Sequence, residues 1–276
     1  SKLTDKPNPQ SLEGSVEEYA RLVSEEVERL RIATDVEGVV LKTDALGSLE
    51  AIAEILRREN VPIRLADVGD VSKREVIEAS EVNDREPLYG AILAFNVKVL
   101  PDAEEEAKNR HVPIFQHSII YHIVDDYIQW MKSVQEARLQ REFDQLVKPG
   151  KIRLLPGYVF RRAKPAIVGV EVLAGRIKPG WVLIDKDGKD VGEIMQVQDR
   201  GDTIQEARIG VQVAVSMDKP TVGRQVNEGD TLHVKMPEND AKTLLTKFQD
   251  RLTPDELGAL NEFIALMRRK LPFWAA

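Results

Sequence analysis

The sequence contains no cysteine, which excludes a disulfide framework and a thiolate metal site. It also contains no run of about 18 apolar residues that could cross a membrane. No cationic segment followed by an apolar segment opens the sequence, so a secretory signal is not expected. These absences predict a soluble, cytoplasmic protein with no membrane partner.

The motifs of several enzyme classes are missing as well. There is no GxxxxGK[ST] phosphate loop, no GxGxxG after a strand, and no GxSxG nucleophile motif. Gly47 and Gly69 each precede a helical run and could aim backbone amides at a phosphate, although ordinary strand-to-helix turns need such glycines too. We therefore expect no catalytic residue and no cofactor in this chain.

A metal site is not expected either. His117 and His122 occur close to Asp125 and Asp126 in the sequence. On a helix, however, residues five positions apart diverge by about 140°, so the two histidines do not share a face. A polar rim on a helix is the simpler interpretation.

A long helical pattern organises the chain at residues 118–147. Apolar residues recur at three- and four-residue steps from Ile120 to Val134, whereas the sequence from Gln135 onward is polar on nearly every side. A helix of this length would extend ~45 Å at ~1.5 Å per residue. We expect one continuous helix, docked on one domain at its start and projecting to a second domain. Two helices broken near Ser133 are the alternative.

Before this helix, β-type and helical runs alternate. The β-type runs cover residues 38–43, 61–69, 88–97 and 112–117, and the helical runs cover 46–59, 73–80 and 102–110. This order predicts a doubly wound parallel α/β/α sandwich over residues 35–117. Residues 1–34 form a lead-in and a predicted helix from Ser15 to Ala33, with a Ser15–Glu18 capping box.

The texture changes after residues 118–150. Short Val/Ile-rich runs over residues 151–236 are cut by KPG, KDGK, DRGD and NEGD turns at intervals of about ten residues, a pattern typical of a closed antiparallel β-barrel. Residues 237–276 are helical again, with Asn239 as one expected cap and Thr253, Pro254 and Glu256 as a strong helix start. The fold class is therefore α/β plus all-β, with a connecting helix and C-terminal helices.

Charge is distributed unevenly between the predicted domains. Residues 35–117 carry 10 Lys and Arg against 17 Asp and Glu, whereas residues 148–236 carry 15 against 11. Tyr158 and Phe160 lie among the cations at the start of the barrel, and cations beside exposed aromatics favour nucleic-acid binding. A hairpin whose charges are neutralised by acidic neighbours is the alternative. The candidate cations are Lys151, Arg153, Arg161, Arg162 and Lys164.

The C-terminal helices contain a second candidate surface. Their apolar stripe is followed by a basic cluster and an apolar end, and an apolar groove beside cations suits an acidic, hydrophobic peptide. Packing of the stripe as core, with only its margins available, is the alternative. The candidate residues are Leu257, Leu260, Ile264, Met267, Arg268, Arg269, Lys270, Phe273 and Trp274.

Three segments together resemble a known family. GVVLKTDALGSLEAIAEIL, VGDVSKREVIEAS and LAGRIKPGWVLIDKDGK are similar to the C-terminal half, the third and fourth domains, of archaeal and eukaryotic translation initiation factor 5B, a relative of bacterial initiation factor two. The resemblance covers the chain from about Ser11. It implies a part of a longer GTPase whose GTP and Mg²⁺ belong to a domain missing here, so this chain would not itself be an enzyme.

The resemblance also implies roles. The α/β domain would face the ribosomal subunits, the long helix would act as a lever, and the barrel would hold the aminoacyl end of initiator tRNA. The C-terminal helices would receive the acidic tail of initiation factor 1A. Bacterial relatives recognise a formyl group with cysteine-containing loops, so a free methionyl end is expected here. The implied pocket residues are Val170, Gln196, Gln198, Gln212 and Val213.

Two other classes of function stay open at this point. A small-molecule enzyme would bind its ligand at the carboxyl ends of the strands near Gly47 or Gly69, with the barrel as a regulatory module. A structural adaptor would instead use the basic barrel to meet an acidic protein surface.

Overall fold

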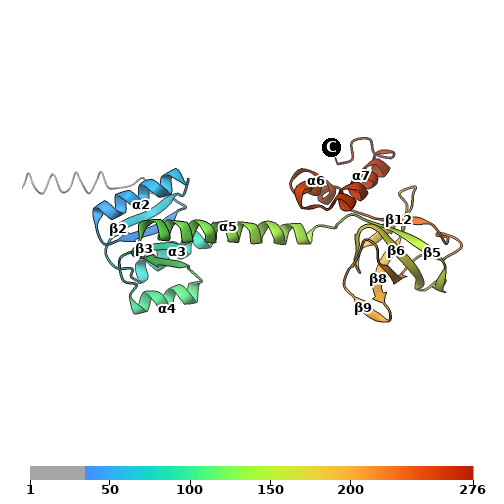
Figure 1. The fold of residues 1–276 in the computed structure, drawn as a ribbon, viewed down its shortest axis with the longest axis horizontal. Coiled ribbons are helices and arrows are strands. Elements are labelled where there is room, and N and C mark those ends of the chain that lie inside the picture. The colour runs from blue at the N-terminus through green and yellow to red at the C-terminus, as the bar shows by residue number, and fades with distance from the viewer. Residues whose placement is uncertain (1–34, 276) are drawn as a thin grey trace, which may run out of the picture. The chain divides into compact units, whose positions relative to one another are not determined.

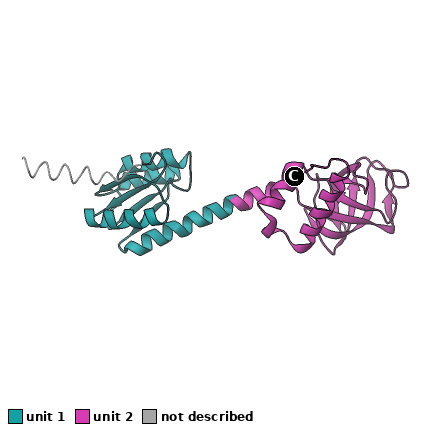
Figure 2. Ribbon diagram, turned by 90° about the horizontal axis from the view of Figure 1, so that it is seen from above, with its two compact units in different colours: residues 1–138 teal, residues 139–276 magenta. Residues whose placement is uncertain are grey.

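The computed structural model describes residues 35–275 and divides into two compact units. Unit 1 ends at Arg138 and unit 2 begins at Leu139 (Figure 2). The predicted helix from Ser15 to Ala33 lies outside the described residues. Each unit has a core of its own, as the length of the chain predicts.

Unit 1 is built on a parallel four-stranded sheet with the order β2-β1-β3-β4 (Figure 1). The strands are β1 (Val39–Thr43), β2 (Ile63–Val68), β3 (Ile92–Phe95) and β4 (Ile114–His117), and the helices between them are α2 (Leu46–Arg58), α3 (Lys73–Asn83) and α4 (Pro101–Arg110). The strand expected over residues 88–97 is shorter than predicted. Leu88 and Tyr89 instead belong to turns in which the Tyr89 amide donates to the Glu86 carbonyl.

Both faces of this sheet are covered by helices. On one face, Leu41 and Leu93 pack against α2 and the start of α5, and on the other, Val40 and Ile92 pack against α3 and α4. All five residues of β1 are consequently buried, because alternate side chains enter opposite cores. The doubly wound sandwich predicted from the sequence is confirmed.

The long helix α5 runs without interruption from Ile120 to Gln145, so the alternative break near Ser133 does not occur. Its first half supplies Ile123, Val124 and Tyr127 to the core of unit 1, and the Tyr127 hydroxyl donates a hydrogen bond to the Leu88 carbonyl at 2.8 Å. Its last turns supply Phe143 to a core of unit 2.

Unit 2 contains a closed antiparallel barrel, as predicted. The ring consists of β5 (Gly150–Arg161), β6 (Ala166–Ile177), β11 (Gln212–Met217), β8 (Asp190–Asp199), β7 (Val182–Ile184) and β12 (Thr231–Val234), with β9 (Asp202–Ile204) and β10 (Ala207–Arg208) outside it. Pairing of β5 with both β6 and β12 closes the ring. Its interior is filled by buried aliphatic residues such as Ile152, Val170 and Leu232.

Two helices and a short 3₁₀ turn follow the barrel. They are α6 (Glu238–Thr246), η1 (Gln249–Arg251) and α7 (Pro254–Arg268). Asn239 is not the cap of α6, because Pro237 with its extended backbone precedes a helix that already begins at Glu238. The predicted start of α7 is confirmed, and the Thr253 amide donates to Glu256 at 3.1 Å.

Two negative findings apply to residues 35–275. No helix in this range is long and apolar enough to cross a membrane. No group of three or more His, Asp or Glu side chains in this range is placed to hold a metal ion.

Candidate nucleic-acid interface

The outer surface of the barrel contains a pocket of about 590 Å³. Strands β5, β6, β8 and β11 and the turn after β8 form it, so residues distant in sequence meet at one site. The lining residues are Leu155, Tyr158, Phe160, Gly169, Gln198, Asp199, Arg200, Gly201, Val211, Gln212, Val213 and Ala214.

Two aromatic side chains stand at this pocket. Tyr158 and Phe160 alternate with Val159 along β5 and are 55% and 65% exposed. Tyr158 lies directly across Gly169, where an added Cβ would come within 2.7 Å of the Tyr158 Cβ. Glycine at position 169 therefore provides the space in which Tyr158 lies at the pocket.

Three of the five residues implied for the pocket line it. Gln198, Gln212 and Val213 are at the site, and Gln196 is exposed on β8 opposite Ser216 but does not line it. Val170 is fully buried in the barrel core, opposite Leu154, so its expected contact with a ligand does not fit the structure. Residues on one strand alternate between the two faces, and Val170 belongs to the inner one.

Arg200 was missed by sequence reasoning. It lies in the DRGD turn between β8 and β9, with φ values of +48° at Arg200 and +96° at Gly201. The turn itself was recognised, but nothing in the sequence shows that it closes one side of the pocket. Arg200 is exposed there beside Asp199 and Gln198.

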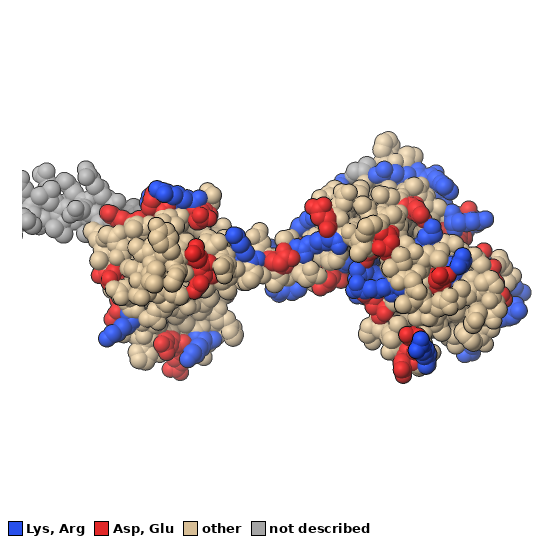
Figure 3. Space-filling view, viewed as in Figure 1, with Lys and Arg blue, Asp and Glu red and all other residues tan. Residues whose placement is uncertain are grey.

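The predicted cations separate into two groups. Lys151 donates to Glu262 at 2.7 Å and Arg153 to Glu171 at 2.6 Å, so acidic neighbours neutralise both. Arg161, Arg162 and Lys164 are exposed at the β5–β6 connection, and the ion pairs found in residues 35–275 do not include them. On the face drawn in Figure 3, Lys and Arg side chains are spread over unit 2 and are sparser on unit 1.

The apolar stripe of α7 is mostly core. Leu260 and Ile264 are 0% and 5% exposed, and they pack with α6 and with Phe143. Trp274 is 6% exposed because its ring lies against Phe263 at 5.3 Å. Leu260, Ile264 and Trp274 are therefore not available to a partner in this structure.

The margins of this helical surface are different. Leu257 and Met267 are half-buried, Arg269 and Lys270 are exposed, and Leu271 and Phe273 are 55% and 86% exposed. Arg268 is occupied, because its guanidinium donates to the carbonyls of Trp274 at 2.9 Å and Ala275 at 3.1 Å.

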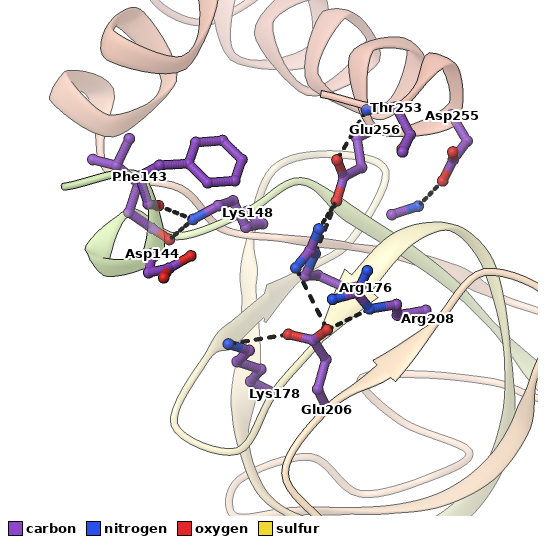
Figure 4. Close-up of polar contacts among 12 residues, drawn as sticks. Phe143, Asp144, Lys148, Arg176, Lys178, Glu206, Arg208, Thr253, Asp255 and Glu256 are labelled. Atoms are coloured by element: carbon purple, nitrogen blue, oxygen red, sulfur yellow. Dashed lines mark hydrogen bonds and ion pairs between the residues drawn. The ribbon is translucent and has the colours of Figure 1, made fainter. Parts of the chain in front are cut away.

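A partly buried ionic cluster joins the barrel to α7 (Figure 4). The Arg176 guanidinium donates two hydrogen bonds to one oxygen of Glu256, at 2.5 and 2.8 Å, and Asp255 accepts from the Gly175 amide at 2.7 Å. Glu206 pairs with Arg176 and also accepts from Lys178 and Arg208. Burial opposes ionisation of Glu206, but these donors outweigh it and leave the pKa of Glu206 lowered.

Lys148 has an unusual position just beyond α5. Its side chain is 2% exposed, and its Nζ donates to the carbonyls of Phe143 and Leu146 and lies 4.2 Å from the Phe143 ring (Figure 4). Burial, followed by repulsion from Arg176, lowers the pKa of Lys148 to about 8. Lys148 therefore caps the helix end and is not part of an exposed basic surface.

The carboxyl edge of the unit 1 sheet is less suited to a phosphate ligand. Asp44 precedes α2, and its carboxylate accepts from the Asn96 side chain at 2.6 Å. Hydrogen bonds from Asn96 and then Ser48 lower the pKa of Asp44, which keeps a negative charge where a phosphate would need cations or free amides. Nearby, Lys42 is occupied by Asp67 and Glu75.

Two family models match the chain. One, described as translation-initiation factor 2, matches residues 14–128, and one described as elongation factor Tu domain 4 matches residues 148–233. The second match covers the barrel strands that carry the pocket.

Proteins similar to nearly the whole of this chain give a consistent result. The chain is 50% identical to a probable translation initiation factor IF-2 of Staphylothermus marinus and 52% identical to that of Hyperthermus butylicus, in each case over 95% of this chain and 43% of the relative. It is similar to the crystal structure of GDP-bound aIF5B from Aeropyrum pernix, with 46% identity, a TM-score of 0.61, and coverage of 95% of this chain and 44% of that one.

The chain thus spans less than half the length of the relatives that it matches. Because this similarity extends over 95% of the chain, it includes both units. Over nearly its whole length, the chain is thus similar to one part of the archaeal translation initiation factors named IF-2 and aIF5B.

Proposed function

We propose that the barrel pocket binds the aminoacyl acceptor end of initiator tRNA. The observation that carries this proposal is the pair of exposed aromatics, Tyr158 and Phe160, at a pocket of about 590 Å³ with Arg200 at its side. A terminal base can stack on such rings, and stacking of one base contributes about 1–3 kcal/mol. Gln198 and Gln212 supply amide donors and acceptors for an aminoacyl ester.

Electrostatic attraction supports the same ligand. Arg161, Arg162 and Lys164 project from the β5–β6 connection and can meet the phosphates of the acceptor strand. The methionyl end is proposed to be free, because the chain has no cysteine of the kind found in formyl-recognising loops.

In the longer proteins of this family, the GTP and Mg²⁺ would be held by the part that this chain does not match. We infer that α5, whose ends belong to the cores of two units, then relays movement between the α/β domain on the ribosomal subunits and the barrel on tRNA. No covalent step is assigned to the residues of this chain.

The tRNA proposal is tested by binding of initiator methionyl-tRNA to the full chain at several salt concentrations. Phe160→Ala should lower affinity about tenfold through lost stacking. Arg161→Glu combined with Arg162→Glu should weaken binding further and reduce its salt dependence. Arg153→Glu, a reversal at a cation already paired with Glu171, is the matched control and should have a smaller effect.

Deacylated tRNA is the second control, since a pocket for the aminoacyl end should distinguish the two forms. Equal affinity of the Phe160→Ala variant and the parent would reject the pocket as the site. If the chain binds methionyl-tRNA, deacylated tRNA and an acidic protein of matched charge with equal affinity, the barrel is an electrostatic adaptor instead.

A second ligand is favoured by the margin of the C-terminal helices. Phe273 and Leu271 are exposed beside Arg269 and Lys270, which suits an acidic peptide with apolar side chains. We propose that this margin binds the acidic C-terminal tail of initiation factor 1A. The burial of Leu260, Ile264 and Trp274 limits the contact to the exposed residues.

Titration with a peptide copying that tail, followed by NMR, tests the second site. Phe273→Ser should weaken binding several-fold without loss of stability, because its side chain is 86% exposed. Trp274→Ser is a poor probe, since loss of its contact with Phe263 would disturb the core. Unchanged chemical shifts beyond Met236 on peptide addition would reject the assignment.

A further inference from the structure

One edge of the unit 1 sheet is open. Strand β4 pairs with β3 on its inner side, and no strand within residues 35–275 pairs with its outer side. The Ile92 amide donates to the Pro113 carbonyl at 3.0 Å and the Asn96 amide to the His117 carbonyl at 2.8 Å. Because partners alternate along a parallel ladder, the backbone N–H and C=O groups of Ile114 and Gln116 point to the free edge.

The same edge lies in a groove of about 630 Å³. Ala107 and Val112 form an apolar wall on one side of the strand, and Trp130 of α5 forms a wall on the other. Val99, Pro113 and Ile114 add further apolar surface, while Glu104, Lys108, His111 and Gln116 supply polar groups. A segment seated here would be enclosed on both faces, as strands of parallel sheets are.

The opposite edge of the sheet differs. There, beside β2, the chain entering unit 1 lies along the end of the strand, and the Asp35 amide donates to the Ile63 carbonyl at 3.0 Å. The sheet order β2-β1-β3-β4 also matches the first four positions of doubly wound sheets with the order 2-1-3-4-5. The free side of β4 is thus the position of a fifth strand.

Charge indicates what kind of segment fits. Residues 35–117 carry 17 acidic side chains against 10 basic ones, and Glu104 and Glu105 are exposed on the helix that flanks the groove. Lys108 offsets only part of this charge. A short apolar segment flanked by Lys or Arg therefore complements both the groove and its surroundings.

We propose that unit 1 binds an extended basic segment of another protein by strand addition at the outer side of β4. The segment would contribute about four apolar residues to the groove, because β4 is four residues long (Ile114–His117), and its backbone would pair with Ile114 and Gln116. This site is separate from the barrel pocket and from the margin of the C-terminal helices. It does not depend on the proposed tRNA or factor contacts.

The probe is the capped peptide Lys-Lys-Val-Ile-Val-Val-Lys-Lys, titrated into the full chain and followed by amide NMR. Saturable shifts are expected at Ile114 and Gln116 and at the Trp130 indole. Gln116→Pro removes the outward N–H without breaking a bond to β3 and should lower affinity about tenfold or more. Gln116→Val keeps that N–H while losing the same side-chain bond to the Val97 carbonyl, so it is the matched control and should bind normally.

Two peptide controls separate strand addition from other contacts. A peptide N-methylated at alternate residues should not bind, and a peptide flanked by Glu should bind more weakly. Equal binding of the N-methylated peptide, or of the Gln116→Pro variant, would overturn the proposal. So would the absence of binding at millimolar peptide. A concentration-dependent dimer abolished by Gln116→Pro would assign the edge to a second copy of this chain and would also overturn it.

Discussion

The two sheets of this chain differ in whether their edge strands are paired. The barrel of unit 2 closes on itself through the pairing of β5 with β6 and β12, so each of its six ring strands has a neighbour on both sides and only the short β9 and β10 outside the ring have a free edge. In the sheet of unit 1, no strand among residues 35–275 pairs with the outer side of β4. A partner of the ring is therefore recognised mainly by side chains, whereas a partner of unit 1 can be recognised by backbone hydrogen bonds.

The units also differ in how their helices are attached. In unit 1, helices cover the sheet through apolar contacts on two faces, and the ion pairs from the sheet to α3 are either long, as between Lys42 and Glu75 at 3.9 Å, or more exposed, as between Arg64 and Glu78. In unit 2, α7 is attached to the barrel by a shorter ion pair with little exposed surface, between Arg176 and Glu256. A buried ion pair depends on both partners being present, so loss of one partner of the Arg176–Glu256 pair should weaken the attachment of α7 strongly.

The largest expected effect comes from breaking that ion pair. Arg176→Met leaves Glu256, which is 3% exposed, as an uncompensated buried carboxylate and should destabilise unit 2 by about 3–5 kcal/mol. Chemical denaturation followed by NMR signals of each unit measures this loss, with unit 1 as the internal reference. Adding Glu256→Gln, which keeps a side chain able to accept from the Thr253 amide, should restore part of the stability. A loss below about 1 kcal/mol for the single variant would contradict the comparison.

A smaller effect is expected on the side-chain surface of the barrel. Gly169→Ala places a methyl group 2.7 Å from the Tyr158 Cβ, which should displace that ring and cost about 1–3 kcal/mol. The same variant should weaken binding of methionyl-tRNA. Gly258→Ala on α7 is the control, since its Cβ would meet nothing within 4 Å and helix propensity favours alanine. Unchanged stability and tRNA affinity of Gly169→Ala would show that Tyr158 can move freely.

A third effect concerns pH. The pKa of Lys148 is about 8 in the folded chain, below its ordinary value of 10.5, because the ammonium group is buried. Between these values the unfolded chain binds more protons than the folded chain, so this group makes unit 2 more stable as pH rises from about 8 to 10.5. Lys148→Met should flatten this part of the stability profile. An identical slope in both proteins would mean that Lys148 keeps its ordinary pKa.

The sequence predicted the fold well because its periodic patterns are strong and local. The alternating runs of residues 38–117, the turn spacing of the barrel and the Thr253–Glu256 helix start each correspond to an observed element. Asn239 failed as a cap because proline at position 237 already fixes the extended backbone before α6. Local sequence preference does not show which of two neighbouring helix-start signals, Pro237 or Asn239, is used.

The candidate sites were less predictable, since they depend on which face a residue occupies. Gln212 and Val170 are opposite in exposure although both were aligned to one pocket. The sequence predicted Lys151 and Arg153 to be part of a binding surface, but in the structure they pair with Glu262 and Glu171. Arg200 entered the site through a turn whose position depends on the closure of the barrel. Such pairings join residues far apart in the chain, and no local pattern encodes them.

The helix α5 has a practical consequence for spectroscopy of this protein. Its apolar residues up to Met131 pack with unit 1, and those from Leu139 pack with unit 2. A ligation junction within either of these two parts of α5 would put residues of one core on two separate fragments. A junction placed within residues 132–138 would leave both cores whole. Segmental isotope labelling through that junction would halve the crowding of NMR spectra and let the two surfaces be titrated in one sample with only one of them visible.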